Sequence, residues 1–300
     1  MILLCGIPSE PPLALLLREL SELRAQVAIF NQRRFDGATL EFRVAKGAIR
    51  GGFEIERDLY PLEAMQAVYA RLMDDADLPE LRDEPADSAR RRRCAELHAR
   101  LLEWLEITPA LVVTRAGPNA SNGSKTYQAA VAAAHGFVVP KTLVTSDPDA
   151  ALAFRKDVGR VVYKSVSGIR SIVSEFGEDD LLRLEAIRWC PVQFQEAVDG
   201  LDVRVHVVGE AVFATAVAST DVDYRYGQAE LTPFELPRDL AHRCIALARA
   251  LDIPFAGIDL RISPSGGVYC FEVNPSPAYS FYEVATGQPI ARALALLLAS

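Results

Sequence analysis

The sequence lacks the features that mark several large classes of protein. Its five cysteines are scattered through 300 residues, with no CxxC pair and no histidine at zinc-like spacing. This pattern argues against a structural zinc site or a disulfide framework, and it is typical of reduced thiols in a cytosolic protein. No basic leader precedes the apolar first residues, and the apolar stretch Ala293–Ala299 is far too short to span a bilayer. We therefore expect a cytoplasmic protein without a membrane partner.

An excess of positive charge is lacking as well. The chain has 32 Lys and Arg residues against 40 Asp and Glu residues, a net charge of −8, which argues against a broad electrostatic grip on nucleic acid. The phosphate-binding pattern GxxxxGK[ST] is absent. Half of the residues are hydrophobic and 24% are charged, which is the composition of a globular enzyme, and the length suits two or three packed lobes.

The first part of the chain alternates between strand and helix patterns. Ile2–Ile7 and Val27–Phe30 are short apolar runs, and Pro11–Arg24 between them carries leucines at helical spacing. A strand, a helix and a strand in this order usually begin an open α/β sheet. The next segments are an extended pair, a helix-or-strand segment, an acidic connector, an arginine-led helix and a last strand: 41–55, 61–72, 74–87, 90–105 and 111–114. We predict an α/β domain over residues 1–117.

The rest of the chain, residues 118–300, has an α+β pattern with largely antiparallel pairing. We divide it into a central lobe, 118–194, and a C-terminal lobe, 195–300. Two hairpins are expected here, each from two extended runs around a turn signal. Their strands are Val192–Val198 with Leu201–Val208, across Asp199-Gly200, and Phe255–Ile262 with Val268–Asn274.

Three polar side chains on the second hairpin are candidate metal ligands. Glu272 and Asn274 are two apart on one strand, so they project to the same face. Asp259 interrupts an apolar run on the partner strand. Two carboxylates and one amide oxygen suit Mg²⁺ that also holds phosphate oxygens. The alternative is a solvated strand face with a local turn at Asn274.

Basic side chains near these strands are candidates for phosphate binding. Lys164 ends an apolar strand just before the small-residue loop Ser165–Gly168, and Lys125 begins a helix. Either could instead be a surface lysine. Arg204 alternates with valines on the strand Leu201–Val208, and Arg225 follows nearby; two arginines could offset the charge of a triphosphate.

The order of these motifs resembles the ATP-grasp superfamily. The motifs are Lys125, Lys164 with SVSG, VQFQEAV, LDVRVHVVG, DYR, GIDL and FEVNPSP. Within the superfamily, GLDVRVHVVGEAVFA is similar to the branch of the glutamate-adding ribosomal-protein ligases. The whole chain resembles the peptide-modifying ligases that make microviridin-like graspetides, most specifically from about Asn119 to the end. The resemblance implies an ATP-grasp fold with an N-terminal α/β pre-ATP-grasp domain.

The resemblance also implies roles for individual residues. ATP would be bound by phosphate-contacting, loop, adenine-reading and ribose-holding residues: Lys125, Lys164, Ser167, Gly168, Gln195, Glu196, Ala197, Val198 and Asp202. Arg204 and Arg225 would be catalytic, stabilising phosphoryl and acyl-phosphate charge. Asp259, Glu272 and Asn274 would bind magnesium, in two ions, with Mn²⁺ as a possible substitute. The cofactors implied are ATP and Mg²⁺.

The implied reaction is ADP-forming ligation of a carboxylate to an amine or hydroxyl through an acyl phosphate. The implied substrate is an acidic precursor peptide, which the basic run Arg90–Arg93 could steer; a solvated helix face is the alternative for that run. A small-molecule ligase that joins amino acids and a nucleotide-binding protein without ligase activity stay open as alternatives. A homodimer is possible. Tyr226-Gly227-Gln228 replaces the serine-asparagine pair of the glutamate-adding enzymes, which leaves the acceptor open.

Overall fold

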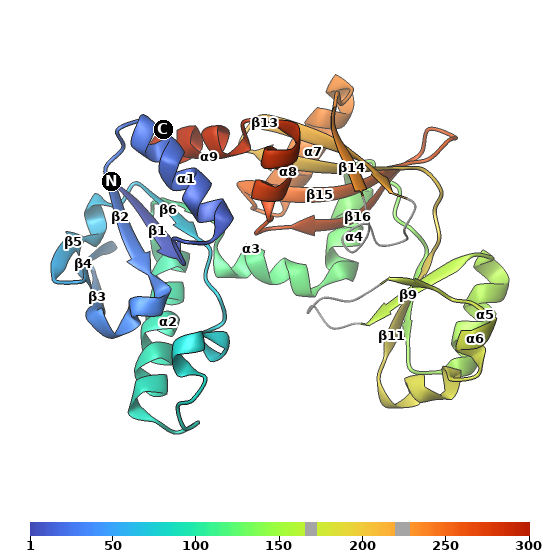
Figure 1. The fold of residues 1–300 in the computed structure, drawn as a ribbon, viewed down its shortest axis with the longest axis horizontal. Coiled ribbons are helices and arrows are strands. Elements are labelled where there is room, and N and C mark those ends of the chain that lie inside the picture. Colours follow the sequence, from blue (N-terminus) through green and yellow to red (C-terminus); the bar gives the residue numbers. More distant parts are fainter. Residues whose placement is uncertain (166–172, 220–228) are drawn as a thin grey trace.

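The computed structural model describes residues 1–165, 173–219 and 229–300. They form three lobes in a row (Figure 1): a parallel sheet with its helices, a large antiparallel sheet in the middle, and a smaller antiparallel sheet at the far end. The smaller sheet belongs to the central part of the sequence, and the large one to the C-terminal part. The expected order, an α/β lobe followed by lobes with antiparallel sheets, is confirmed.

The first lobe is built on a parallel sheet with the strand order β2-β1-β6-β7. Its strands are β1 (Ile2–Gly6), β2 (Val27–Asn31), β6 (Ala67–Ala70) and β7 (Leu111–Val113). The segment 61–72, which fitted helix or strand, contains the short helix η2 (Leu62–Ala64) and then the strand β6. A buried central strand in a parallel sheet needs apolar side chains on both faces, and every residue of β1 is buried.

Helices cover both faces of this sheet. On one side lies α2 (Ala89–Ile107), whose Trp104 packs in the same core as Leu3 of β1. On the other side lies α1 (Pro11–Glu22), together with α9 (Ile290–Ala299) from the other end of the chain. The last helix of the chain, α9, thus completes the hydrophobic core on this side of the first lobe (Figure 1). The domain boundary at 117/118 stays a prediction.

A three-stranded antiparallel sheet extends the first lobe. It consists of β3 (Ala38–Ala45), β4 (Ala48–Ile55) and β5 (Asp58–Pro61). The predicted extended pair forms its hairpin, β3–β4. Lys46 and Gly47 make the turn with φ of 51° and 75°, the left-handed backbone that a tight hairpin turn needs.

The arginine run on α2 holds the acidic connector before it. Arg90 pairs with Asp36 and Glu84, and Arg91 and Arg92 donate to backbone carbonyls of the connector. The connector contains the short helices η3 (Asp75–Asp77) and η4 (Pro79–Leu81). These internal contacts favour a structural role for the run over steering of a peptide.

The central lobe contains a four-stranded antiparallel sheet ordered β10-β9-β11-β8. Its strands are β8 (Thr142–Thr145), β9 (Val161–Ser165), β10 (Ser174–Glu175) and β11 (Val192–Glu196). The helices α5 (Pro148–Val158), α6 (Glu178–Leu181) and η6 (Leu184–Trp189) accompany it. Phe176 and Phe194, with ring centroids 5.2 Å apart, lie in its own small core.

The C-terminal sheet has five strands in the order β14-β13-β12-β15-β16. They are β12 (Leu201–Val208), β13 (Ala211–Ser219), β14 (Ala229–Phe234), β15 (Phe255–Ile262) and β16 (Val268–Asn274). α3 (Ala116–Ala120) follows the first lobe and leads into η5 (Ser121–Gly123). Along the sheet lie α4 (Lys125–Ala134), α7 (Arg238–Ala250) and α8 (Tyr279–Thr286). Val203, Val205 and Val207 of β12 pack in one core with α7. The predicted hairpin β15–β16 is confirmed.

The other predicted hairpin is wrong. β11 pairs with β8 and β9 in the central sheet, whereas β12 pairs with β13 and β15 in the C-terminal sheet. Asp199-Gly200 belongs to the linker that connects the central sheet to the C-terminal sheet. Gly200, with φ of 154°, is required because a Cβ there would lie 2.3 Å from the carbonyl oxygen of Ile262.

Two linkers, one around Val138 and one around Val198, connect the central lobe to the C-terminal sheet. Both form hydrogen bonds with the β15–β16 hairpin. At the first, Val138 N donates to Val268 O, and Cys270 N donates to Val138 O. At the second, Arg261 Nη1 donates to Val198 O over 2.7 Å. Val138 bridges to Tyr269, which is also the register partner of Arg261. Over the described ranges, no helix is both long and apolar enough to cross a membrane.

Candidate active site

The predicted metal-binding carboxylates face each other across the β15–β16 hairpin. Asp259 and Glu272 are register partners, and the ladder shifts by one residue immediately after Asp259. On the other side of β15, Arg204 of β12 is the partner of Asp259. Adjacent strands therefore bring Arg204, Asp259 and Glu272 into one row across the sheet. Side chains of directly opposed residues lie close enough to interact.

Lys125 joins this row from the start of α4. Its Nζ lies 2.6 Å from Glu272 Oε1, and the two side chains are 27% and 29% exposed. Burial alone would raise the pKa of Glu272, but the charge and hydrogen bond of Lys125 and the charges of Lys164 and Arg204 lower it overall. Lys125 therefore contacts Glu272 directly, whereas Lys164, on β9 of the central lobe, acts on it through its charge.

Arg204 forms the second ion pair of the row. Its Nη1 donates to Asp259 Oδ1 over 2.7 Å, and its side chain is 7% exposed. Gly257 makes room for this guanidinium, because a Cβ there would lie 2.0 Å from Arg204 Nη2. Burial raises the pKa of Asp259, Arg204 lowers it and Glu272 raises it again, with a net upward shift. Two carboxylates with opposed pKa shifts therefore sit side by side.

Asn274 ends β16 and is held by its own turn. Its Oδ1 accepts a hydrogen bond from Ser276 N over 2.9 Å, the local turn that was the alternative to a ligand role. Gln128 of α4 clamps the preceding residue, because its side chain both donates to Val273 O and accepts from Val273 N. An accepting amide oxygen can still bind a cation through its second lone pair.

These residues fit a magnesium site by chemistry. Asp259, Glu272 and Asn274 offer oxygen donors on one hairpin, and hard cations such as Mg²⁺ take carboxylate and carbonyl oxygens. Lys125 and Arg204 already neutralise the two carboxylates. In the part of the chain that the structure describes, no three His, Cys, Asp or Glu side chains cluster as a metal site. The predicted set has only two such residues, so its third protein ligand would have to be the amide.

Asp202, predicted to hold a ribose, is engaged within the protein. Arg261 Nε and Nη2 lie 2.6 Å and 2.7 Å from its two carboxylate oxygens. The same guanidinium donates to Val198 O. The structure therefore ties two predicted nucleotide residues to one arginine that sequence reasoning did not select.

The predicted adenine-reading segment, Glu196–Val198, runs from the end of β11 into the linker between the two sheets, directly after the predicted cofactor-binding residue Gln195. The backbone N–H groups of Glu196 and Ala197 donate to Lys141 O and Arg160 O. The side chain of Gln195 donates to Thr142 Oγ1. The segment is thus fixed against neighbouring strands, and adenine contacts there stay a prediction. Ser167, Gly168 and Arg225 lie outside the described residues, as does most of the predicted loop Ser165–Gly168.

His206, which alternates with Arg204 on β12, does not line a cleft. It is fully buried, with its ring centroid 5.0 Å from that of Tyr282. Burial first, and the charge of Arg204 second, hold its pKa well below the ordinary 6.5. On the polar face of β12, Arg204 therefore belongs to the site and His206 belongs to the hydrophobic core.

Besides Arg261, sequence reasoning missed three residues near the site: Arg71, Thr114 and Gln128. Arg71 and Thr114 contact the turn after Asn274 from positions 205 and 161 residues away. The only local signal is a polar residue directly after a buried strand, at the carboxyl end of β6 and of β7. Gln128 gives no signal in an alanine-rich helix.

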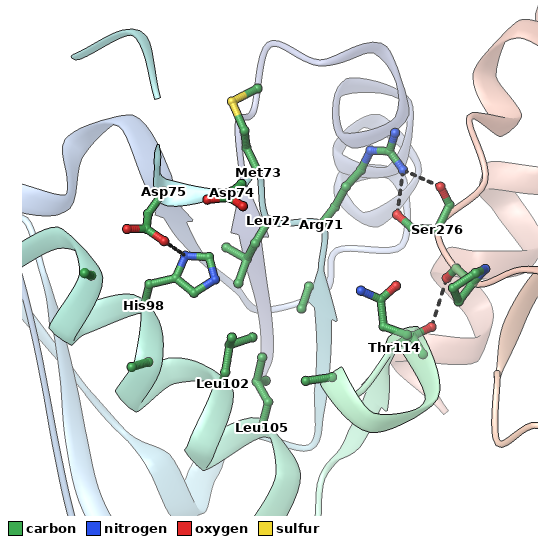
Figure 2. A pocket seen from close by; sticks show the side chains of 16 residues that line it. Arg71, Leu72, Met73, Asp74, Asp75, His98, Leu102, Leu105, Thr114 and Ser276 are labelled. Carbon is green, nitrogen blue, oxygen red and sulfur yellow. Dashed lines mark hydrogen bonds and ion pairs between the residues drawn. The ribbon is translucent and has the colours of Figure 1, made fainter. Parts of the chain in front are cut away.

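A cavity of about 440 Å³ adjoins the site on the side of the first lobe (Figure 2). Its walls come from the end of β6, α2 and the turn that contains Pro275 and Ser276. Asp75 and His98 lie at one end of the view, and Arg71 with Ser276 at the other. Of the predicted metal and nucleotide residues that the structure describes, none lines it.

Solved structures with this fold cover the whole chain. They include the macrocyclase MdnC of Microcystis aeruginosa MRC bound with precursor peptide MdnA (TM-score 0.83, 21% identity, 100% of both chains). Another is a RiPP-associated ATP-grasp ligase of Chryseobacterium gregarium in complex with ADP and a leader and core peptide (0.85, 21%, 99% and 96%). A third is the ATP-grasp ligase PsnB with minimal precursor, Mg and ADP (0.81, 24%, 99% and 96%).

No functionally curated protein matches the sequence significantly. The RimK-like ATP-grasp domain family does match, over residues 122–298. This span begins just before Lys125 and includes Lys164, Arg204, Asp259 and Glu272. The match covers more than half of the chain, so the chain belongs to the RimK-like ATP-grasp family, and the expected ATP-grasp ligase is confirmed.

Proposed function

We propose that this protein uses ATP and Mg²⁺ to activate a side-chain carboxylate of a ribosomal peptide and couples it to an amine or hydroxyl. The γ-phosphate of ATP passes to the carboxylate, which becomes an acyl phosphate with ADP as the leaving group. The amine or hydroxyl then attacks the acyl carbon, and phosphate leaves. The product is an amide or an ester.

The observation that carries the proposal is the charged row Lys125, Glu272, Asp259 and Arg204, with Lys164 acting on Glu272 from the central lobe. Bound Mg²⁺ would neutralise phosphate charge, held by Asp259, Glu272 and Asn274. Lys125 and Lys164 would orient the phosphates, and Arg204 would stabilise charge that develops on the transferred phosphoryl group. These roles need positioning and electrostatics, and no side chain has to act as a nucleophile.

A peptide substrate is supported by the relatives that share this fold from end to end. MdnC, the Chryseobacterium gregarium ligase and PsnB each have a precursor peptide in their structures. PsnB also has Mg and ADP. The site residues of the present chain fit the same chemistry, and its predicted location is the cytoplasm.

The test is a ligation assay with ATP, Mg²⁺ and short acidic peptides, the first choice being any that a neighbouring reading frame encodes. We expect ADP release and the loss of one water from the peptide for each bond formed, measured by mass spectrometry. Glu272→Gln is the matched control, because it removes a predicted metal ligand at nearly constant shape. Turnover of free amino acids without change in the peptide would establish the small-molecule ligase instead. Nucleotide binding without ADP release from either would establish the non-catalytic alternative.

A further inference from the structure

The turn that follows Asn274 has an unusual set of supports. Pro275 and Pro277 have no backbone N–H, so this segment can donate few hydrogen bonds of its own. Three successive carbonyl oxygens, those of Pro275, Ser276 and Pro277, accept hydrogen bonds from side chains of the first lobe. The donors are Thr114 and Arg71. The turn beside the predicted metal site is therefore supported from a different lobe.

Arg71 makes most of these contacts. Its Nη1 lies 2.9 Å from Ser276 Oγ, 3.1 Å from Ser276 O and 3.4 Å from Pro277 O. Figure 2 shows this guanidinium directed from the first lobe toward Ser276, at the edge of the cavity. A charged donor strengthens each of these hydrogen bonds relative to a neutral one.

The first lobe fixes Arg71 in turn. Its Nε donates to Glu10 Oε2 over 3.2 Å, and its side chain is 20% exposed. Its backbone N–H donates to Cys5 O. Gly6 permits this close approach, because a Cβ there would lie 2.5 Å from Arg71 O. The arginine is therefore anchored to the buried strand β1 and cannot move independently of the first sheet.

Thr114 supplies the second support. Its Oγ1 donates to Pro275 O over 3.1 Å, and the residue is 8% exposed. Ser276, which Arg71 holds, in turn holds the side chain of Asn274, because its N–H donates to Asn274 Oδ1. The chain of contacts runs from Glu10 through Arg71 and Ser276 to the side chain of Asn274.

We propose that Arg71 and Thr114 are positioning residues for Asn274, so that the first lobe sets the affinity of the site for the magnesium–nucleotide complex. The inference rests on the proposed function, in which Asn274 binds Mg²⁺. Residues that orient a metal ligand through hydrogen bonds typically change metal affinity about 10- to 100-fold when they are removed. Neither Arg71 nor Thr114 has to contact the substrate.

The test measures Mg²⁺-dependent binding of a non-hydrolysable ATP analogue by calorimetry, alongside the Mg²⁺ dependence of ADP release. Arg71→Ala should raise the half-saturating Mg²⁺ concentration about tenfold or more, with a smaller change in kcat at saturating Mg²⁺. Arg71→Lys should restore part of the affinity. Thr114→Val, which keeps the shape and removes the donor, should shift it in the same direction. Arg33→Ala, which breaks the first-lobe pair with Glu80, is the control and should bind normally.

The same measurement separates this inference from the proposed function. If Glu272→Gln loses Mg²⁺-dependent binding while folded Arg71→Ala and Thr114→Val bind as the wild type does, the positioning role is wrong and the metal site stands. If Glu272→Gln also binds normally, the metal site itself is wrong. If Arg71→Ala does not fold, Arg71→Lys and Thr114→Val decide the matter.

Discussion

The ion pair at the site on the C-terminal sheet and a pair on the edge of the central sheet differ in how far they are buried. On the C-terminal sheet, the side chains of Arg204 and Asp259 are 7% and 33% exposed. On the central lobe, those of Arg160 and Glu175 are 59% and 51% exposed. Exposed pairs contribute little to stability because water and salt screen them. Half-buried charges are costly to desolvate and are retained where a ligand needs them.

The largest effect should come from the half-buried row. Glu272→Gln keeps the shape of the side chain but removes the charge that would hold Mg²⁺, so ADP release should fall more than about a hundredfold. The melting temperature should change little, because Glu272 pairs at a partly exposed position with Lys125. Glu175→Gln in the central lobe is the matched control and should retain activity. Normal turnover by Glu272→Gln would refute the metal assignment.

Lys164 tests whether the central lobe contributes one charge of its own to the site. Lys164→Met keeps the aliphatic stem and removes a charged hydrogen bond to phosphate, worth about 1.5–3 kcal/mol. The Kd for ATP should rise about tenfold or more, measured by calorimetry. Lys156→Met, at an exposed position on α5, should leave it unchanged. An unaltered Kd for Lys164→Met would leave the lysine as a surface residue at a strand end.

His206 differs from the paired charges of the site because it is buried without a hydrogen-bond partner, which affects its pKa. No described residue forms a hydrogen bond with its ring nitrogens, and its pKa is held well below 6.5 by burial and by Arg204. The unfolded chain therefore binds the proton first, and the stability of the folded state falls as pH drops below about 6.5. Above that pH, both states are neutral and the effect vanishes. His206→Phe should flatten this part of the curve in denaturant titrations between about pH 5 and 7. An unchanged slope would mean that His206 does not contribute.

The smallest effect should come from the exposed pairs of the central lobe. Arg160→Ala removes the contacts with Glu175 and Asp199, both of which are open to solvent. Melting temperature and ATP turnover should equal those of the wild type in physiological salt. A clear loss of either would show that burial does not separate the two regions.

The parts of the fold that followed from the sequence are those set by local patterns. The period of two on β16 placed Glu272 and Asn274 on one face, and the apolar runs marked β1 and β2. The hairpin between β11 and β12 was predicted wrongly because Asp199-Gly200 has the composition of a tight turn. The glycine is needed there for the close approach of Ile262 O, a long-range contact that no local pattern reveals.

The same distinction applies to the site. Lys125 and Lys164 could be selected because each begins or ends an element beside small residues. Arg71 and Arg261 could not, because each acts on a carbonyl group far away in the sequence. Such contacts depend on which sheets come together, and side-chain type gives no signal for them. The pairing of Asp202 with Arg261 across adjacent strands belongs to this second kind.

The two linkers of the central lobe have a mechanical consequence. Arg261, which binds Val198 O, and Tyr269, which bridges to Val138, face each other on one rung of the β15–β16 hairpin. Because both attachments lie at one register position of the hairpin, the central lobe could rotate about the line that joins them. Such a rotation would change the distance between Lys164 of the central lobe and Glu272 of the C-terminal sheet. Small-angle scattering with and without nucleotide would detect the rotation as a change in the radius of gyration, and identical curves would exclude it. The β15–β16 hairpin would then be the hinge about which the central lobe moves Lys164 toward or away from the metal-binding residues.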